Sequence, residues 1–301
     1  ENYGKLRDSL DRPLLNRALN GRYAPGSTIK GLVGLAALEY GISPASTEIC
    51  PGWYSLPGSS QRYRCWRHAG HGSVTLQSAI AQSCDVYFYS VAHQLGIDYL
   101  HGFLTEFGLG RRTGIDLHNE PTGLVPSKEW KERARDEVWY PGETVITGIG
   151  QGYMLVTPIQ LAVMTATLAN NGTRVAPRLV TAVRAADHET VQELPILIKQ
   201  QVNLSDPGSM SIISDAMQEV THGERGTARA IGADALYRMA GKSGTAQVIG
   251  IAQDEKYDAD KIPERLRDHA LFVAYAPVEN PKIAVVVIVE NGGSGSGVAA
   301  P

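Results

Sequence analysis

The chain has 301 residues, 43% of them hydrophobic, which is enough to bury a large core in one big domain or one domain with a small lobe. Its formal net charge is −3 and no basic stripe with interleaved aromatic residues occurs, so nucleic acid is not an expected partner. The longest strongly apolar run, residues 283–289, is too short to cross a bilayer, and no signal peptide opens the sequence.

The first strong pattern is an apolar helix that follows a Pro-Gly loop. Residues 29–38 are apolar nearly all round, which predicts a buried helix capped by Gly41. Ser27 stands at the start of this helix, and Lys30 follows one turn later on the same face. Burial disfavours a charged lysine, and a neutral amine can take the proton of a neighbouring hydroxyl and make it a nucleophile. The alternative is a serine N-cap followed by a lysine that extends to solvent.

The next hundred residues alternate between irregular and helical patterns. Residues 50–72 are rich in glycine and proline without a helical or strand period, which predicts a long ordered loop. Helices are expected from residue 75 to a break at Ser83-Cys84-Asp85, from 86 to 95, and from 98 to 107. Charge, glycine and proline then predict an irregular lobe over residues 108–142.

The rest of the chain predicts two helices and a sheet. Thr157-Pro158 is a good helix start, for a helix that ends near residue 168, and residues 210–220 form an amphipathic helix. Strands are expected at residues 179–183, 237–248, 270–275 and 283–289, the last two as a hairpin, and the tail at 292–297 is a linker or a turn into a further helix. The class is therefore α+β, an antiparallel sheet flanked by helices, with a helical subdomain at about residues 42–160.

Three short motifs in this chain can carry chemistry. They are Ser27-x-x-Lys30, Ser83-x-Asp85 and Lys242-Ser243-Gly244-Thr245. The second lies at a helix break, where side chains face a cleft, and the third lies on a predicted strand, where a glycine lets a ligand approach and a lysine with hydroxyls suits a carboxylate. Each alone could be a helix cap, an interhelical turn or a polar edge strand. The set in this order is typical of β-lactamases and penicillin-binding proteins.

With these motifs, the sequence resembles the transpeptidase domain of class B penicillin-binding proteins. It is most similar to the elongation-specific penicillin-binding protein 2 branch of Gram-negative bacteria. Further matches lie at residues 11–18, 85–89, 148–153, 157–160, 264–269 and 290–293. Asp85 departs from the wider superfamily, which usually has asparagine there. The membrane anchor, the pedestal and the final helix of such proteins lie outside these residues.

The resemblance implies a fold and a reaction. The fold is that of penicillin-binding proteins and serine β-lactamases, and the reaction cross-links peptidoglycan stem peptides through an acyl-enzyme that β-lactams also form. The resemblance makes Ser27 the nucleophile and Lys30 its base. Ser83, Asp85 and Lys242 would form the proton relay. The substrate carboxylate would be bound by Ser243, Gly244 and Thr245. The N–H groups of Ser27 and Thr245 would form the oxyanion hole.

The resemblance also implies a cellular setting. The anchor would place this domain at the periplasmic face of the bacterial inner membrane. A RodA-type glycosyltransferase and the elongation scaffold would be its partners.

Two other functions share the motifs. A serine β-lactamase needs a base for deacylation, and Glu120-Pro121 resembles the start of that motif, but Thr122-Gly123-Leu124 follows it in place of Leu-Asn. A β-lactam sensor would share Ser27 and Lys30 without cross-linking stem peptides. The lifetime of the penicilloyl-enzyme separates the first alternative from a transpeptidase.

The three cysteines and one histidine predict a structural zinc site. The expected ligands are Cys50, Cys65, His71 and Cys84. Three thiolates and one imidazole form a closed tetrahedral set, and a metal there would order the long loop. His68 is the weaker histidine because Arg64 and Arg67 flank it. The resemblance favours zinc, while a Cys50–Cys65 disulfide with a buried third cysteine is the alternative.

Overall fold

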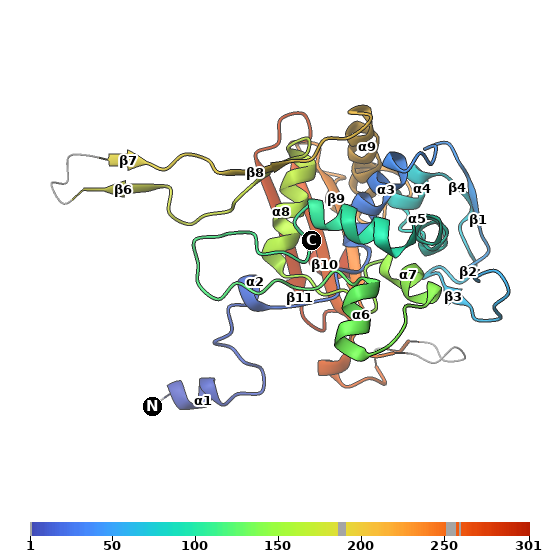
Figure 1. Cartoon of the computed structure of the whole chain (residues 1–301), viewed down its shortest axis with the longest axis horizontal. Helices are drawn as coiled ribbons and strands as arrows, with labels where there is room; N and C mark the ends of the chain where they lie inside the picture. The colour runs from blue at the N-terminus through green and yellow to red at the C-terminus, as the bar shows by residue number, and fades with distance from the viewer. Residues whose placement is uncertain (1, 186–190, 251–256, 259) are drawn as a thin grey trace.

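The computed structural model describes residues 2–185, 191–250, 257–258 and 260–301. Its central sheet has three antiparallel strands in the order β11-β10-β9 (Figure 1). The strands are β9 (Ala240–Ala246), β10 (His269–Ala276) and β11 (Ile283–Val289), as the sequence predicts. Pairing sets Lys242 opposite Val273 and Thr245 opposite Ala270, which fixes the third motif on the edge strand β9.

Helices α8 (Pro158–Ala169) and α9 (Gly208–His222) pack against this sheet, and α3 (Lys30–Glu39) packs on α9. Helix α3 is buried along most of its length, as expected for a helix that is apolar on every side. Helix α9 lies between α3 and β9, and α8 packs on β10 and β11. Thr157 caps α8 by accepting a hydrogen bond from the Gln160 N–H. The core therefore lies between the sheet and these three helices.

Four further helices lie within residues 42–160, the part for which a helical subdomain was predicted. The helices are α4 (Leu76–Ala81), α5 (Asp85–Glu106), α6 (Lys128–Arg135) and α7 (Pro141–Thr147). Helix α5 joins the two helices expected on either side of Gly96, whose φ of 73° makes a kink rather than an end. Because α5 packs on α3, the break before it lies beside the start of α3.

Two predictions of irregular structure are wrong in part. The segment 50–72 carries short antiparallel pairs: β1 (Glu48–Cys50) with β4 (Gly72–Val74), and β2 (Trp53–Tyr54) with β3 (Tyr63–Arg64). Within the lobe at 108–142, helix α6 forms because Ser127 caps its start and because Lys131, a buried residue of the helix itself, pairs with Glu143. Because a buried ion pair rather than an apolar face stabilises this helix, its sequence has no apolar periodicity from which the helix could be predicted.

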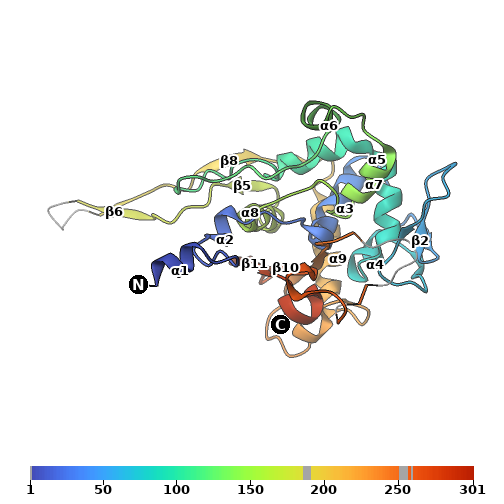
Figure 2. The same ribbon diagram turned by 90° about the horizontal axis from the view of Figure 1, so that it is seen from below.

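Two further strand pairs form a ribbon that extends to the left of the body in Figure 1. They are β5 (Thr173–Val175) with β8 (Ile198–Gln201), and β6 (Ala182–Arg184) with β7 (Val191–Glu193). The strand expected at 179–183 thus begins only at Ala182. In Figure 2, α1 (Tyr3–Arg7) extends from the same side of the body as β6.

Short elements complete the chain. They are α2 (Arg17–Asn20), η1 (Gly26–Ile29), η2 (Arg229–Ile231), η3 (Glu264–Leu266) and η4 (Gly295–Ala299). The tail therefore turns into a helical segment, η4, rather than a flexible linker. None of the described helices combines the length and the apolar character that a membrane crossing requires.

Candidate active site

Ser27 lies in η1, one turn before α3 begins at Lys30. The loop before it is clamped between two other segments. Gly26 has φ +53°, its N–H donates to the Gly150 carbonyl at 2.8 Å, and a Cβ there would collide with the Thr245 carbonyl oxygen. Only glycine satisfies both the left-handed backbone and this close approach. The clamp holds Ser27 against the end of β9.

Lys30 is fully buried and turns toward the second motif. Its Nζ donates to Asp85 Oδ1 at 2.7 Å, to the Ser83 carbonyl at 3.0 Å and to Ser83 Oγ at 3.3 Å. Ser83 has φ 55°, a left-handed turn that directs both its oxygens at the lysine. The described hydrogen bonds of Lys30 therefore go to Ser83 and Asp85 rather than to Ser27.

Lys242 reaches the same hydroxyl from the opposite side. Its Nζ donates to Ser83 Oγ at 3.0 Å and to the Ser243 carbonyl at 3.0 Å. Complete burial lowers the pKa of Lys242 well below the ordinary value, and the charge of Lys30 lowers it further, while Asp85 opposes the shift. Ser83 Oγ thus connects an ion-paired ammonium with a lysine that burial drives toward the neutral amine.

Asp85 begins α5 and has partners on both oxygens. Oδ1 accepts from Lys30, and Oδ2 accepts from the Trp66 backbone N–H at 2.8 Å. Burial raises the pKa of the Asp85 carboxyl, and the charge of Lys30 opposes that rise. The Trp66 indole N–H also donates to the Ser83 carbonyl at 3.0 Å. Trp66 was not predicted as a site residue, because its backbone contact with Asp85 leaves no signal in residue type and its indole contact is visible only in the folded chain.

The third motif lines the opposite wall. Ser243 Oγ lies 2.9 Å from Thr227 Oγ1, and the Thr245 carbonyl accepts from Gln151 Nε2 at 2.9 Å. A Cβ at Gly244 would stand 2.7 Å from a methyl of Thr28, so glycine lets β9 lie against the serine loop. Thr227 and Gln151 were not predicted as site residues.

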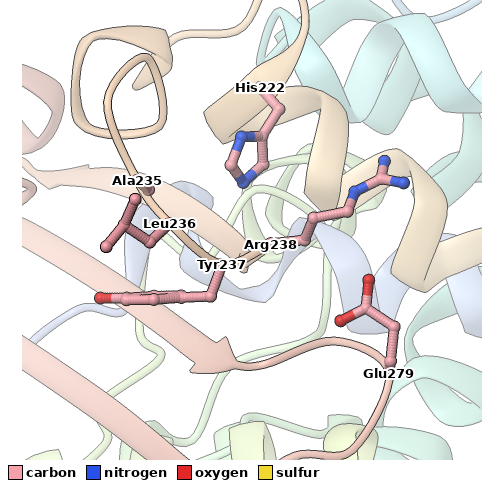
Figure 3. A pocket seen from close by; sticks show the side chains of 6 residues that line it. All are labelled: His222, Ala235, Leu236, Tyr237, Arg238 and Glu279. Atoms are coloured by element: carbon pink, nitrogen blue, oxygen red, sulfur yellow. The ribbon is translucent and has the colours of Figure 1, made fainter.

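These groups face a groove of about 640 Å³. Its lining includes Ser27, Ser83, Asp85, Ser243, Gly244 and Thr245. Figure 3 shows a smaller hollow of about 380 Å³, lined by His222, Ala235, Leu236, Tyr237, Arg238 and Glu279. Since that hollow contains no residue of the three motifs, the groove is the candidate active site.

The four predicted metal ligands also come together. Their ligand atoms all lie within 4.8 Å of one another. His71 Nδ1 is 3.6 Å from Cys50 Sγ and 3.5 Å from Cys65 Sγ. In a zinc tetrahedron with ordinary bond lengths, sulfur and nitrogen are about 3.6 Å apart. All three cysteines are free and buried, so the geometry fits a metal and shows no Cys50–Cys65 disulfide.

The charge state of this cluster also fits a cation. A hydrogen bond with Cys84 lowers the pKa of Cys65 to about 3, and the same contact raises the pKa of Cys84. Two neighbouring thiols therefore share one proton, and a divalent cation would let both ionise. His68 lines the active-site groove instead of joining the cluster.

The carboxylate considered as a deacylating base is engaged elsewhere. Glu120 is buried and accepts from the Thr113 N–H at 2.7 Å, the Thr113 hydroxyl at 2.6 Å and the Gly114 N–H at 3.1 Å. It is not among the residues that line the groove. Its position fits a turn stabiliser rather than a base that activates water.

Comparison with known proteins identifies the family. A family model described as "Penicillin binding protein transpeptidase domain" matches residues 1–301. Peptidoglycan D,D-transpeptidase MrdA of Acinetobacter baumannii is 44% identical over 301 residues, which cover 99% of this chain and 44% of that protein.

Two solved structures are also similar. The Pseudomonas aeruginosa PBP2 complex with WCK 5153 matches with TM-score 0.87 and 50% identity, covering 99% of this chain and 61% of that one. The Helicobacter pylori PBP2–MreC complex matches with TM-score 0.84 and 33% identity, covering 98% and 51%. This chain spans about half the length of the curated relatives it matches. Motifs, fold and similarity agree: the chain belongs to the penicillin-binding protein transpeptidase domain family.

Proposed function

We propose that this chain is the catalytic domain of a peptidoglycan D,D-transpeptidase that cross-links stem peptides during cell elongation. The observation that carries the proposal is the pair of buried lysines on either side of one serine hydroxyl, beside a second serine in an open groove. Two lysines near a hydroxyl can move a proton without a histidine or a metal ion.

The proton path begins with the ion-paired lysine. A proton passes from Lys30 to Ser83 Oγ, and Ser83 gives its own proton to Lys242, whose neutral amine would turn its lone pair toward that hydroxyl while still donating to the Ser243 carbonyl. The distances of 3.3 and 3.0 Å suit such a relay. Lys30 is then neutral and takes the proton of Ser27 as that oxygen attacks. Asp85 keeps Lys30 in place through the exchange.

The chemical steps follow from an activated Ser27. Its oxygen attacks the carbonyl between the two terminal D-alanines, the C–N bond breaks, and D-alanine leaves with the proton returned by Lys30. The amine of a second stem peptide then attacks the ester, loses a proton to the relay and releases Ser27. The N–H groups of Ser27 and Thr245 would hold the oxyanion, and each such donor contributes about 3 kcal/mol in other hydrolases.

Substrate binding would fall to the third motif. The terminal carboxylate of the donor peptide would accept from the hydroxyls of Ser243 and Thr245, with Gly244 allowing its approach. Lys242 helps neutralise that charge. A β-lactam presents a carboxylate and an acyl carbonyl at similar positions, so it would acylate Ser27 as well.

We also propose that Cys50, Cys65, His71 and Cys84 hold one structural Zn²⁺. The ion would supply charge neutralisation and a cross-link, while the chemistry of the groove needs no metal. Cys65 precedes Trp66, whose N–H holds Asp85, and Cys84 stands between Ser83 and Asp85. The cluster would therefore fix two sides of the catalytic turn. Elemental analysis should find about one zinc per chain.

The cellular setting is part of the proposal. An anchor outside these residues would hold the domain at the periplasmic face of the bacterial inner membrane, with a RodA-type glycosyltransferase and the elongation scaffold as partners. The similar Helicobacter pylori protein was solved with MreC. Co-purification of the full-length protein with its glycosyltransferase, lost when the anchor is exchanged for an unrelated one, would support this assignment.

The test of the activity is a cross-linking assay with full-length protein. Stem peptides ending in D-Ala-D-Ala should lose D-alanine and form dimers. A β-lactam sensor would take up penicillin without forming dimers, and a β-lactamase would release hydrolysed penicillin within seconds. Either result would replace the proposed function.

A further inference from the structure

One acidic side chain in the groove has no place in the reaction described above. Asp268 lines the groove and is only 7% exposed. Its Oδ1 accepts a 3.3 Å hydrogen bond from the Val248 N–H. Across the described residues, no lysine, arginine or histidine forms an ion pair with it. A desolvated carboxylate without a cation is costly to keep, and such groups cluster at binding sites.

The strand register fixes where Asp268 lies relative to the acylation site. Thr245 pairs with Ala270, and Ser243 pairs with Phe272. Asp268 directly precedes β10, which begins at His269, and both Asp268 and Thr245 line the groove. Continued by one residue, the alternation of β10 gives Asp268 the same face as Ala270, the partner of Thr245. Diagonal neighbours of this kind have Cα atoms about 7–8 Å apart. Asp268 is therefore about two extended residue lengths from the point where the donor carboxylate would bind.

The chemistry of the proposed substrate supplies a cation at that distance. This step rests on the proposed function, in which a cross-link joins a donor carbonyl to the side-chain amine of a second stem peptide. Every stem peptide carries that amine, so the donor carries it too, on the residue before its D-Ala-D-Ala end. Two extended residues separate it from the terminal carboxylate and span about 7 Å, and a long side chain adds further reach.

We propose that Asp268 binds the side-chain ammonium group of the donor stem peptide. The carboxylate holds that amine in its charged, unreactive form and away from the acyl ester, so the acceptor's amine alone attacks. Tyr257 and Gln247 line the same end of the groove and offer further oxygen acceptors for the ammonium. Burial raises the pKa of the Asp268 carboxyl, and a bound ammonium would return that pKa toward its ordinary range.

The experiment compares two donor peptides in the full-length protein. One is a stem pentapeptide with a free lysine amine as its third residue, and the other has that amine acetylated. The readout is kcat/KM for D-alanine release, which covers the steps up to departure of D-alanine whatever later attacks the ester. We expect the unmodified protein to prefer the free amine by about tenfold. Asp268→Asn should lose that preference, since asparagine keeps the acceptor for the Val248 N–H and removes the charge.

Two controls make the result decisive. Asp258→Asn removes an acid that is partly exposed and pairs with Lys261 outside the groove lining, and it should keep the preference. Acylation by benzylpenicillin, which has no ammonium group, is measured in both variants and reports whether the site still reacts. The preference is a ratio of two donors in the same variant, so a general change in activity cancels from it. An unchanged preference in Asp268→Asn, or none in the unmodified protein, would overturn the inference. Absence of both D-alanine release and penicillin uptake would instead refute the proposed function.

Discussion

Replacing Lys242 by methionine separates catalysis from stability. Methionine nearly keeps the length and volume of the side chain and removes only the amine. That amine is fully buried, donates to Ser83 Oγ and the Ser243 carbonyl, and has no carboxylate partner among the described residues. The relay would lose its proton acceptor, so acylation should slow by about 100- to 10,000-fold.

The same substitution should not lower the stability of the fold. Each pH unit by which burial lowers the pKa of Lys242 costs the folded state about 1.4 kcal/mol. The two acceptors left without a donor cost about 1 kcal/mol each, and removing a buried amine whose pKa lies well below its ordinary value opposes that cost. Lys242→Met should therefore melt at the same temperature as the unmodified protein, or higher, at neutral pH.

The sign of the pH dependence follows from proton uptake. Between the lowered pKa of folded Lys242 and the ordinary value of 10.5, the unfolded chain binds more protons. The free energy of unfolding of the unmodified protein therefore rises with pH across that window. The variant lacks this titration, so its stability advantage should be largest at low pH and shrink toward pH 10.5.

The assay combines penicillin acylation rates with melting curves between neutral and alkaline pH. Lys131→Met is the matched control, because Lys131 is a second buried lysine, paired with Glu137 and Glu143 away from the groove. It should lower the melting temperature while leaving acylation unchanged. Normal acylation in Lys242→Met, or a loss of several kcal/mol in stability, would contradict the assignment of Lys242 to the relay.

Three further predictions test the serine loop, the metal cluster and the cellular role. Gly26→Ala should slow acylation by more than about tenfold, because its Cβ would force the Thr245 carbonyl away from Ser27. The control Gly58→Ala, also at positive φ but in open space, should leave acylation unchanged. Cys84→Ser should contain no zinc by elemental analysis. Its melting temperature should be lower and its acylation slower, since metal binding contributes directly to folding. Metal-free protein with full activity would exclude the zinc proposal. Depleting the full-length protein should give round cells under the microscope, and filaments would point to a division enzyme instead.

The sequence predicted best where one physical signal dominates. The apolar run at residues 29–38 matches α3, and the β-branched run at 283–289 coincides with β11. The strands in segment 50–72 could not be predicted, because their ladders are two or three residues long and present no apolar face. Helix α6 was missed for a similar reason, since charged contacts of Lys131 hold it.

Within the site too, side-chain chemistry could be read from the sequence, whereas contacts that depend on the path of the backbone could not. The motif residues were selected from the chemistry of their side chains, and the structure brings together Ser27, Lys30, Ser83, Asp85, Lys242 and Thr245. The contact of the Trp66 N–H with Asp85 and the place of Asp268 in the groove lining depend on the path of the folded chain. Neither leaves a trace in residue spacing, so only the folded chain reveals them.

The most direct test of the central claim is the intact mass of the full-length protein after exposure to benzylpenicillin, followed over time. The account predicts one penicilloyl adduct per chain, on the peptide that contains Ser27, persisting for hours and absent from Ser27→Ala. An adduct on another peptide, uptake by Ser27→Ala, or loss of the adduct within seconds would contradict it.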